Sequence, residues 1–416
     1  MFIIRKTDCD YKMEEKMAFY SKEQLEKYAD VLIWGLNTAR PGFKPHENIL
    51  LRCSLPGREL GEIIYRKLIQ QKYNVIFRFL STPENEKSFY QYSDEEQLGF
   101  MPPGDKEMYE GLNGNILVYA PESLTHLKDI DTKRQSIAML ARKPLREIMN
   151  RREENGEFGW TLCTYPTEEL ARQAGLSIQE YADQIAKACL LNEADPVRKW
   201  TEIFENTKAI KEWLRGLDID TVHIESEHAD LEVKIGERRR FKGISGHNIP
   251  SFEIFTSPDW RYTKGIYFAN LPAFRGGNLV QNIRLEFKEG RAVGISAEKG
   301  DDYVKKILAT DEGACQVGEF SLTDKRFSKI DKFMADTLFD ENHGGVNGNC
   351  HIAVGSAYAD TFDGDVRKLT PDMKKELGFN DSAVHWDMIN TEKKKVTALL
   401  KDGRKVTIYE DGMFKN

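Results

Sequence analysis

A histidine and an aspartate two positions apart form the clearest chemical pattern in this sequence. His385 and Asp387 lie in the segment AVHWDMI. On a β-strand they would point to the same side, because side chains alternate, and Val384, Trp386 and Met388 would fill the other face. A His-x-Asp pair framed in this way suits metal ligation or proton relay. We therefore predict a functional role for this pair.

Two glutamates interrupt other apolar, strand-like runs. Glu253 lies in SFEIFTSP, and Glu319 lies in QVGEFSL. A carboxylate in such a run faces either the solvent or a site, because the side chains of a strand alternate. Taken singly, each glutamate is explained at least as well by an outward-facing position. Their role therefore depends on the residues that join them.

The segment ENHGGVNGNCHIAVGSAY contains Glu341, His343, Cys350, His351 and Tyr358. A phosphate-binding loop is not expected, because the glycines of this segment neither follow a strand nor lead into a helix that begins with Lys-Ser/Thr. No second cysteine pair supports a structural zinc site at Cys350. We interpret His351 as a ligand and His343 as a loop residue that shapes access.

Six of the eight histidines follow residue 220. His223 and His228 lie in the charged segment HIESEH, where a surface position is expected, so we do not predict them as ligands. The remaining candidates are four carboxylates and two imidazoles, namely Glu253, Glu319, Glu341, His351, His385 and Asp387. This set suits two divalent cations, with zinc, cobalt or manganese favoured, magnesium possible and calcium disfavoured. Such a pair lowers the pKa of a bound water and polarises a carbonyl, which is hydrolase chemistry.

The elements that position these residues differ between the two halves of the chain. In the first half, a helix over 21–40 begins with a Ser21/Gln24 capping box, and strand, helix and strand follow over 48–55, 57–73 and 74–81. This βαβ order, with a further strand over 114–121, predicts a parallel sheet. A long helix is expected over 195–217.

The second half is predicted to be β-rich. Residues 230–237 and 282–287 alternate with period two, and hairpins are expected around Gly290 and Gly403. Helices are expected over 302–311 and 326–339. We therefore predict an α/β amino-terminal domain over 1–218 and an α+β, β-rich catalytic domain that binds the metals over 219–416.

Composition narrows the function classes further. The net charge of −7 argues against general nucleic-acid binding, and no apolar run approaches the about 20 residues of a membrane helix. The amino terminus turns charged after four residues, so it lacks the apolar core of a signal peptide. Six scattered cysteines without a C-x-x-C pair predict reduced thiols in a cytoplasmic protein.

Five motifs in order, NIPSFEIFTSP, GEFSL, TLFDEN, CHIAVGSAY and HWDMI, together with the earlier HENILLRCSLPGRELGEIIYRKL, resemble the thermophilic metalloaminopeptidases of the aminopeptidase T and aminopeptidase S group. The resemblance runs from about Phe19 to the carboxyl terminus. It implies an exopeptidase that removes amino-terminal residues from peptides with two metal ions. It also implies an α/β amino-terminal domain, a separate catalytic domain and a homodimer that encloses the active sites.

The resemblance also assigns roles to individual residues. The family's metal ligands fall on Glu253, Glu319, Glu341, His351, His385 and Asp387. Its active-site tyrosine falls on Tyr358, which would donate to the tetrahedral oxyanion. Either Glu319 or Glu341 would bridge the metals or handle the proton. Two departures affect substrate preference more than the metal site: the HGGVNGN spacer lengthens the step to His351, and Pro250 to Phe252 replace the family's usual aspartate–glycine pair.

Other functions remain open at this point. Another binuclear hydrolase, such as a phosphoesterase or an amidohydrolase, would share the ligand types, although D-x-H, G-N-H-D/E and early H-x-H motifs are absent from the sequence. A non-catalytic metal- or peptide-binding protein would be expected to lack a ligand, and all six positions are filled. A nucleotide site in the first half would need a glycine-rich loop that the sequence does not contain.

Overall fold

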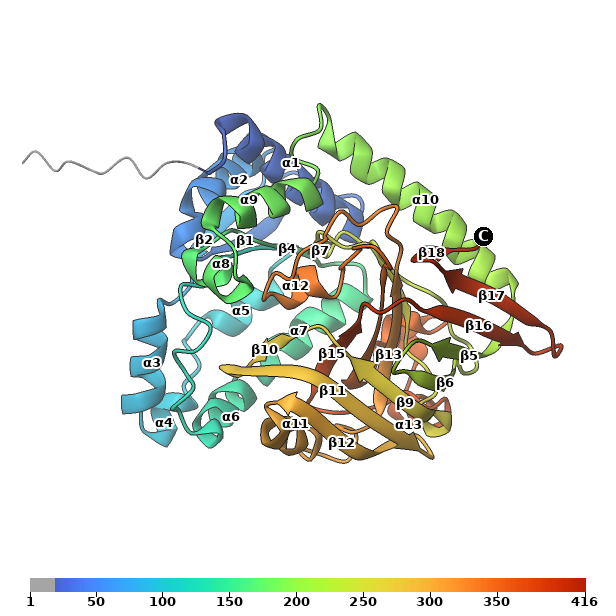
Figure 1. The fold of residues 1–416 in the computed structure, drawn as a ribbon. Coiled ribbons are helices and arrows are strands. Elements are labelled where there is room, and N and C mark those ends of the chain that lie inside the picture. The colour runs from blue at the N-terminus through green and yellow to red at the C-terminus, as the bar shows by residue number, and fades with distance from the viewer. Residues whose placement is uncertain (1–18) are drawn as a thin grey trace, which may run out of the picture.

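The computed structural model describes residues 19–416, which form an α/β half and a β-rich half (Figure 1). Cys9 and the charged amino-terminal segment lie outside the described residues. The five described cysteines, Cys53, Cys163, Cys189, Cys315 and Cys350, are free thiols, as predicted. Within residues 19–416, no helix is both long and apolar enough to cross a membrane.

A parallel five-stranded sheet organises the first half, in the order β2-β1-β3-β4-β7. Its strands are β1 (Asn48–Cys53), β2 (Asn74–Phe79), β3 (Gly114–Tyr119), β4 (Gly159–Thr164) and β7 (Asn248–Ile249). The predicted βαβ unit is confirmed, since β1 and β2 pair in parallel. The two-residue strand β7, which follows residue 218, was not expected in this sheet.

The first half also contains α-helices, the longest of which, α10, runs along the second half (Figure 1). They are α1 (Lys22–Ala39), α2 (Arg58–Gln70), α3 (Pro83–Tyr92), α4 (Glu95–Leu98), α5 (Asp105–Glu110), α6 (Thr132–Ala141), α7 (Lys143–Glu154), α8 (Glu168–Ala174), α9 (Ile178–Ala188) and α10 (Pro196–Gly216). The capping box predicted for α1 is present, because the Ser21 and Gln24 side chains each accept a hydrogen bond from the other residue's backbone N–H. The long helix α10 also matches its predicted range.

Two antiparallel sheets build the second half. The larger has nine strands in the order β10-β11-β9-β6-β5-β16-β17-β18, with β12 beside β11. Its strands are β5 (Ile219–Glu225), β6 (Asp230–Lys234), β9 (Lys264–Ala269), β10 (Ala273–Arg275), β11 (Asn278–Lys288), β12 (Arg291–Lys299), β16 (Lys395–Leu400), β17 (Lys405–Glu410) and β18 (Met413–Phe414). The hairpins predicted around Gly290 and Gly403 are both present.

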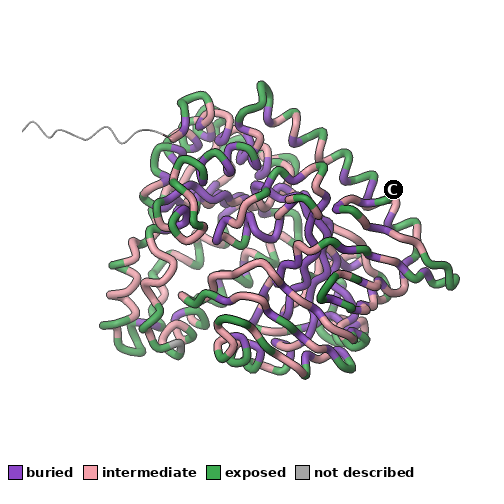
Figure 2. The backbone as a smooth tube through the Cα atoms, viewed as in Figure 1, coloured by how far each residue is buried: buried purple, intermediate pink, exposed green. Residues whose placement is uncertain are grey.

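The smaller sheet has four strands in the order β15-β14-β13-β8. They are β8 (Glu253–Thr256), β13 (Val317–Thr323), β14 (Asn349–Gly355) and β15 (His385–Asn390). Three short helices complete this half, namely α11 (Asp301–Leu308), α12 (Thr337–Asp340) and α13 (Pro371–Glu376). Buried residues concentrate along the central strands of both halves (Figure 2).

The expected helix over 326–339 is wrong, because only α12 at its end is helical. Side chains bind the backbone N–H groups that a helix would have used, and such local hydrogen bonds compete with helix formation. Ser328 Oγ accepts from the Ile330 N–H at 3.3 Å, and Asp340 accepts from the N–H groups of Met334 and Asp336 at 2.8 and 3.0 Å. Ala335 has a φ of +53°, which also interrupts a right-handed helix.

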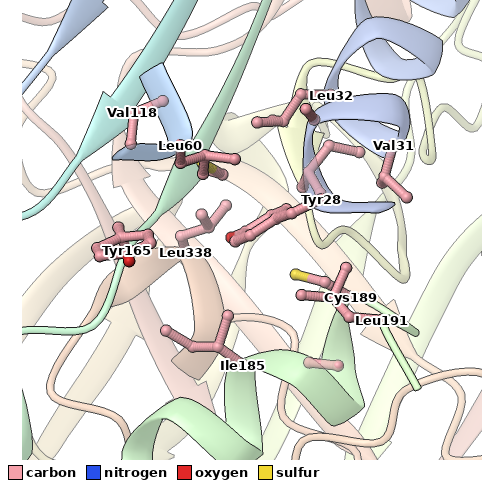
Figure 3. Close-up of a cluster of buried hydrophobic side chains, with 14 of the residues drawn as sticks. Tyr28, Val31, Leu32, Leu60, Val118, Tyr165, Ile185, Cys189, Leu191 and Leu338 are labelled. Carbon is pink, nitrogen blue, oxygen red and sulfur yellow. The ribbon is translucent and has the colours of Figure 1, made fainter. Parts of the chain in front are cut away.

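One hydrophobic core joins the two halves. Its buried residues come from α1, α2, the parallel sheet and α9, and they also include Phe252, Leu338 and Phe339 from the second half. Figure 3 shows Leu338 lying near Tyr28, Leu60 and Tyr165 in this cluster. The loop before α12 is therefore fixed by the core of the first half. The division into two domains at residue 218 remains a prediction.

Candidate metal centre

Five of the six predicted ligands come from one face of the four-stranded sheet. Its four strands contribute Glu253 from β8, Glu319 from β13, His351 from β14, and His385 and Asp387 from β15. The antiparallel registers place them on a common face. Ser321 pairs with both His351 and Phe255, and each ligand lies an even number of positions, along its own strand, from this row of paired residues. The predicted same-side placement of His385 and Asp387 is thus present.

The opposite face of this sheet is apolar and fixes the register. Ile254, Phe320, Ile352, Trp386 and Met388 alternate with the ligands and are buried in one core cluster. A one-residue slip would move every ligand to the apolar side, because the side-chain period is two. The core behind the sheet therefore keeps the polar groups together on its other face.

The first group of ligands surrounds the imidazole of His351. Its Nε2 lies 3.3 Å from Glu253 Oε2 and 3.2 Å from Glu319 Oε1. His351 is fully buried, and its Nδ1 makes no hydrogen bond. Ser321 Oγ donates to Glu253 Oε2 at 3.1 Å and holds that carboxylate in place. These three ligands form a compact group that could hold a metal ion.

A second group forms around His385. Its Nε2 lies 3.7 Å from Glu319 Oε2 and 3.3 Å from Asp387 Oδ1. Its Nδ1 lies 2.8 Å from the carbonyl oxygen of Ser356, which accepts only if Nδ1 carries the proton. The Nε2 lone pair then faces the carboxylates, as in a metal-binding histidine whose other nitrogen donates to a carbonyl.

Glu319 belongs to both groups. Its Oε1 faces His351 and its Oε2 faces His385, so the two oxygens of one carboxylate point to two separate ligand sets. Asp387 lies between them as well, with Oδ1 3.9 Å from His351 Nε2. The two groups of candidate ligands therefore share the carboxylate of Glu319.

Glu341 reaches the site from outside the sheet. It follows α12 directly, and it is buried with 8% exposure. Phe339 and Leu338 anchor this helix in the core that joins the two halves. Asn342 Oδ1 accepts from the Phe252 N–H at 2.6 Å, and Asn349 Nδ2 donates to the Glu341 carbonyl at 2.7 Å. These contacts tie Glu341 to the segments that carry Glu253 and His351.

The ionisable groups of the site perturb one another strongly. Burial and then the charge of Glu319 raise the pKa of Glu253, and burial and then the charge of Glu253 raise the pKa of Glu341. Burial alone would lower the pKa of His351, but its hydrogen bond to Glu319 and the surrounding charges raise it to about 9. At His385, burial lowers the pKa and the charge of Asp387 raises it, and the resulting pKa is about 9. The carboxylates therefore favour positive charge at this place.

The donor set fits divalent metal ions. Among residues 19–416, no lysine or arginine forms an ion pair with Glu253, Glu319, Glu341 or Asp387. Imidazole Nε2 atoms and carboxylate oxygens converge there, and this combination suits zinc, cobalt or manganese. A cation between the converging lone pairs would replace their repulsion with attraction.

Tyr358 lies at the edge of the site. Its ring centroid is 4.8 Å from that of His385, and its backbone N–H donates to Ser257 Oγ at 2.8 Å. The residue is 46% exposed. Burial of part of its side chain and then the charge of Glu319 raise the pKa of Tyr358, so its hydroxyl keeps its proton. It is therefore available as a hydrogen-bond donor beside the ligands.

The remaining histidines are not part of this cluster. His343 lies in the inserted loop, and burial lowers its pKa. That loop is held in place, since the N–H groups of Gly344 and Gly345 both donate to the Ile330 carbonyl. The exposed His228 belongs to a third group of possible ligands, with Glu227 and Glu392. In this group His228 Nδ1 lies 2.5 Å from Glu392 Oε1. Glu392 also accepts from Ser226 Oγ, so ordinary hydrogen bonds account for this group.

Sequence reasoning missed the residues that orient the ligands. Ser321 lies two positions after Glu319 on the same strand, and that spacing could have indicated it. Asn342 stands directly beside Glu341, but its bond to the Phe252 N–H joins segments 90 residues apart. No local pattern shows such a contact.

The sequence also matches a known family model. The description of that model is thermophilic metalloprotease (M29), and the match covers residues 21–414. The chain belongs to this family. As a member of the thermophilic metalloprotease family, it is a peptide hydrolase, and family membership implies a divalent metal ion at its site.

Several curated proteins are similar to this M29 chain. Aminopeptidase AmpS of Bacillus subtilis (strain 168) is 30% identical over 304 residues, which cover 69% of this chain and 73% of that protein. Aminopeptidase PepS of Streptococcus thermophilus is 26% identical over 432 residues, which cover 94% of this chain and 98% of that protein. The family resemblance expected from the five motifs is thereby confirmed.

A solved structure shares the fold. The structure of wild-type AmpT from Thermus thermophilus superposes with a TM-score of 0.80 at 23% identity, covering 95% of this chain and 100% of that chain. The likeness confirms a mixed α/β fold with a parallel sheet and antiparallel sheets for this M29 metalloprotease.

Proposed function

We propose that this protein is a metal-dependent aminopeptidase with two divalent metal ions, held by Glu253, Glu319, His351, His385 and Asp387, with Glu341 beside them. The observation that carries the proposal is the position of Glu319, whose two oxygens face two separate ligand groups. Family membership supports peptide hydrolysis, and the relatives' names support removal of amino-terminal residues. Zinc, cobalt and manganese suit the donors best, and magnesium is a further candidate.

The metal ions, when bound, would polarise the scissile carbonyl and lower the pKa of the attacking water. Glu319 is the residue best placed to help hold both ions, because it belongs to both groups. Glu341 is in neither group of three, and Asn248 and Asn342 reach its Oε1 only at 3.5 and 3.4 Å. We therefore assign proton transfer to Glu341, as a carboxylate with a raised pKa can perform it.

Tyr358 would stabilise the tetrahedral oxyanion. Its hydroxyl retains a proton, and its ring packs against the imidazole of His385. A donor held in this way acts without reorganising during the reaction, which is the usual source of its catalytic effect.

Three further proposals concern the whole protein. They are a homodimer, which the resemblance in the motifs implies, a cytoplasmic location, which the scattered cysteines favour, and a division into domains at residue 218. The free thiols of the described cysteines agree with a reducing compartment. Sedimentation analysis of the purified protein would test the dimer, and a monomer at micromolar concentration would contradict it.

A metal-reconstitution assay tests the function. The purified protein is stripped with a chelator and assayed on an aminoacyl-arylamide with and without Co²⁺, Zn²⁺ or Mn²⁺. Activity should require metal, and the N-acetylated form of the same substrate should not be cleaved. Metal-independent cleavage, or none with any metal, would contradict the proposal. Hydrolysis of an aryl phosphate instead would favour a binuclear phosphoesterase.

Three variants locate the site within the chain. His385→Ala and Glu253→Ala should lose activity, whereas His228→Ala should not. His228 is a suitable control because it also bonds to a carboxylate, but at an exposed position. Full activity of His385→Ala would show that the site lies elsewhere.

A further inference from the structure

A serine, a histidine and a glutamate outside the metal centre form a connected chain of contacts. Ser245 Oγ lies 2.6 Å from His247 Nδ1, and His247 Nε2 lies 2.9 Å from Glu153 Oε1. None of these three residues belongs to the groups of candidate metal ligands. The chain has the parts of an activated nucleophile, namely a hydroxyl, a general base and a carboxylate that orients the base.

The carboxylate decides which nitrogen of His247 carries the proton. An ionised carboxylate only accepts, so Nε2 would donate to Glu153 and Nδ1 would keep the lone pair that accepts from Ser245. The angle at Nε2 is not that of an aligned hydrogen bond, but this nitrogen is buried and no other group within residues 19–416 bonds to it. Contacts of this kind often tighten only when a substrate binds. His247 is therefore oriented to take a proton from Ser245.

Trp160 holds both partners of the second contact. Its indole N–H donates to Glu153 Oε2 at 3.2 Å, and its ring centroid lies 4.4 Å from that of the His247 imidazole. Glu153 comes from α7 and Trp160 from β4, and His247 directly precedes β7. The imidazole is thus positioned by regular elements of the first half, and not only by the loop that carries it.

The backbone around Ser245 is strained. Ile244 has a φ of +49°, which is unfavourable for a β-branched residue, and Gly246 has a φ of +85°. A Cβ at Gly246 would lie 2.2 Å from the carbonyl oxygen of Gly35, so the loop packs tightly against α1. Strain of this kind persists where the surroundings impose it, and it is concentrated at functional sites. Ser245 itself remains partly exposed, so a small molecule can reach it.

A backbone donor follows the serine directly. In the part of the chain that the structure describes, the N–H of Gly246 makes no hydrogen bond. In serine hydrolases whose nucleophile lies on a strained turn, the N–H after the nucleophile supplies one donor to the tetrahedral oxyanion. The loop therefore offers a nucleophile, a base and a donor for the developing negative charge.

We propose that Ser245 is a second nucleophile, which hydrolyses small carboxylic esters independently of the metal ions. Its Oγ attacks the carbonyl carbon while His247 Nδ1 takes the hydroxyl proton. The imidazolium returns that proton to the leaving alkoxide as the C–O bond breaks, which leaves an acyl ester on Ser245. A water molecule that His247 deprotonates then cleaves this ester, so the carboxylic acid leaves and the serine is restored.

A fluorophosphonate probe tests the nucleophile directly, because an activated serine displaces its fluoride and forms a stable phosphonate ester. The metal-loaded full chain is treated with the probe, and the adduct is located by peptide mass spectrometry. We expect one adduct, on Ser245, both before and after treatment with a chelator. Ser245→Ala should abolish it, and His247→Gln should slow its formation about 10²-fold or more, because a general base contributes this much.

The chain contains a matched control for this experiment. Ser226 and His228 have the same spacing as Ser245 and His247, and they also meet a glutamate, Glu392. There the serine hydroxyl donates to Glu392 Oε2 at 2.7 Å, and the imidazole contacts the same carboxylate. Ser226 therefore has no base beside it and should stay unlabelled. Labelling of both serines at the same rate would show that exposure alone explains the reaction.

Glu153 acts through His247 and is a positioning residue. In Glu153→Gln the amide can donate to Nε2, which places the imidazole proton on Nδ1 and removes the base. Labelling of Ser245 should then slow about 10²-fold or more, and Glu153→Asp should recover part of the rate. An equal loss in both variants would overturn the role given to Glu153.

Ester turnover separates this site from the proposed aminopeptidase. Chelator-treated wild type should hydrolyse 4-nitrophenyl acetate, whereas chelator-treated Ser245→Ala should not, and metal-loaded Ser245→Ala should keep wild-type arylamide hydrolysis. The absence of an adduct on Ser245, or an unchanged labelling rate in His247→Gln, would overturn the inference. Labelled Ser245 in a protein that cleaves no arylamide with any metal would overturn the aminopeptidase proposal alone.

Discussion

Glu319 is the residue on which the arrangement of the site depends. It lies on β13 with 3% exposure, and its two oxygens face the imidazoles of His351 and His385. The same carboxylate that holds one ligand group in place therefore also holds the other. A change at this position should affect both cation sites at once.

Glu319→Gln should reduce bound metal at both sites and lower kcat/KM by about 10²-fold or more, because loss of an essential electrostatic group has effects of this order. Metal content by mass spectrometry and arylamide hydrolysis measure the two effects. Glu232→Gln is a matched control on β6, where the carboxylate pairs with Lys264 in the larger sheet. A fully metallated, fully active Glu319→Gln would exclude the shared-ligand role.

Tyr358→Phe should separate catalysis from metal binding. The change removes only a hydroxyl from a residue outside both ligand groups. We expect kcat to fall about 10²- to 10³-fold with metal content unchanged, which is the usual effect of removing one oxyanion donor. Steady-state kinetics beside the exposed control Tyr262→Phe measure this. Unchanged kcat would remove Tyr358 from the reaction.

At the level of elements, the site depends on a four-residue helix that packs into another part of the molecule. Leu338 and Phe339 of α12 are buried in the core shared with α1, α2 and α9. Tyr181 on α9 donates through its hydroxyl to the Met334 carbonyl at 2.9 Å and holds the preceding loop. The position of Glu341 is therefore set by contacts with the first half of the chain.

Leu338→Ala should lower the free energy of unfolding by about 2–5 kcal/mol, because it creates a cavity in the core. It should also lower activity, since α12 would hold Glu341 less firmly. Urea denaturation and arylamide hydrolysis measure the two effects. Leu140→Ala, at a position with 62% exposure, should change neither. A destabilised variant with wild-type kcat would show that Glu341 is placed independently of α12.

The sequence correctly predicted the elements whose patterns are formed by residues close together in the chain. The capping box at Ser21, the alternation around Asp387 and the glycine turns at Gly290 and Gly403 each depend on neighbouring residues, and all are present. The expected helix over 326–339 has helical spacing of apolar residues, but its polar residues bind the backbone instead. Hydrogen bonds from side chains to the backbone therefore outweigh the helix propensity of this segment.

Long-range placement could not be predicted from the sequence. Residues 248–249 form a strand too short to show a pattern, yet they complete the parallel sheet beside β4. The six candidate ligands were recognised by type and order, but the sharing of Glu319 and the position of Glu341 depend on strand register and on the docking of α12. These features come from packing between segments far apart in the chain.

At the scale of the whole molecule, metal binding should stabilise the fold. Three buried carboxylates and the partly buried Asp387 converge without a lysine or arginine ion pair among the described residues, so a cation that binds only the folded chain removes their repulsion. Chelation should lower Tm by several degrees, because ligand at about 100 times its Kd contributes about 2.7 kcal/mol. Calorimetry with and without re-added metal measures this, and equal Tm values would contradict it.

Anomalous scattering from a metal-loaded crystal tests the proposed centre most directly. We predict two peaks per chain, one among Glu253, Glu319 and His351 and the other among Glu319, His385 and Asp387, with Glu319 in contact with both. A single peak, two peaks that do not share Glu319, or metal only at the exposed group around His228 would contradict the dinuclear site.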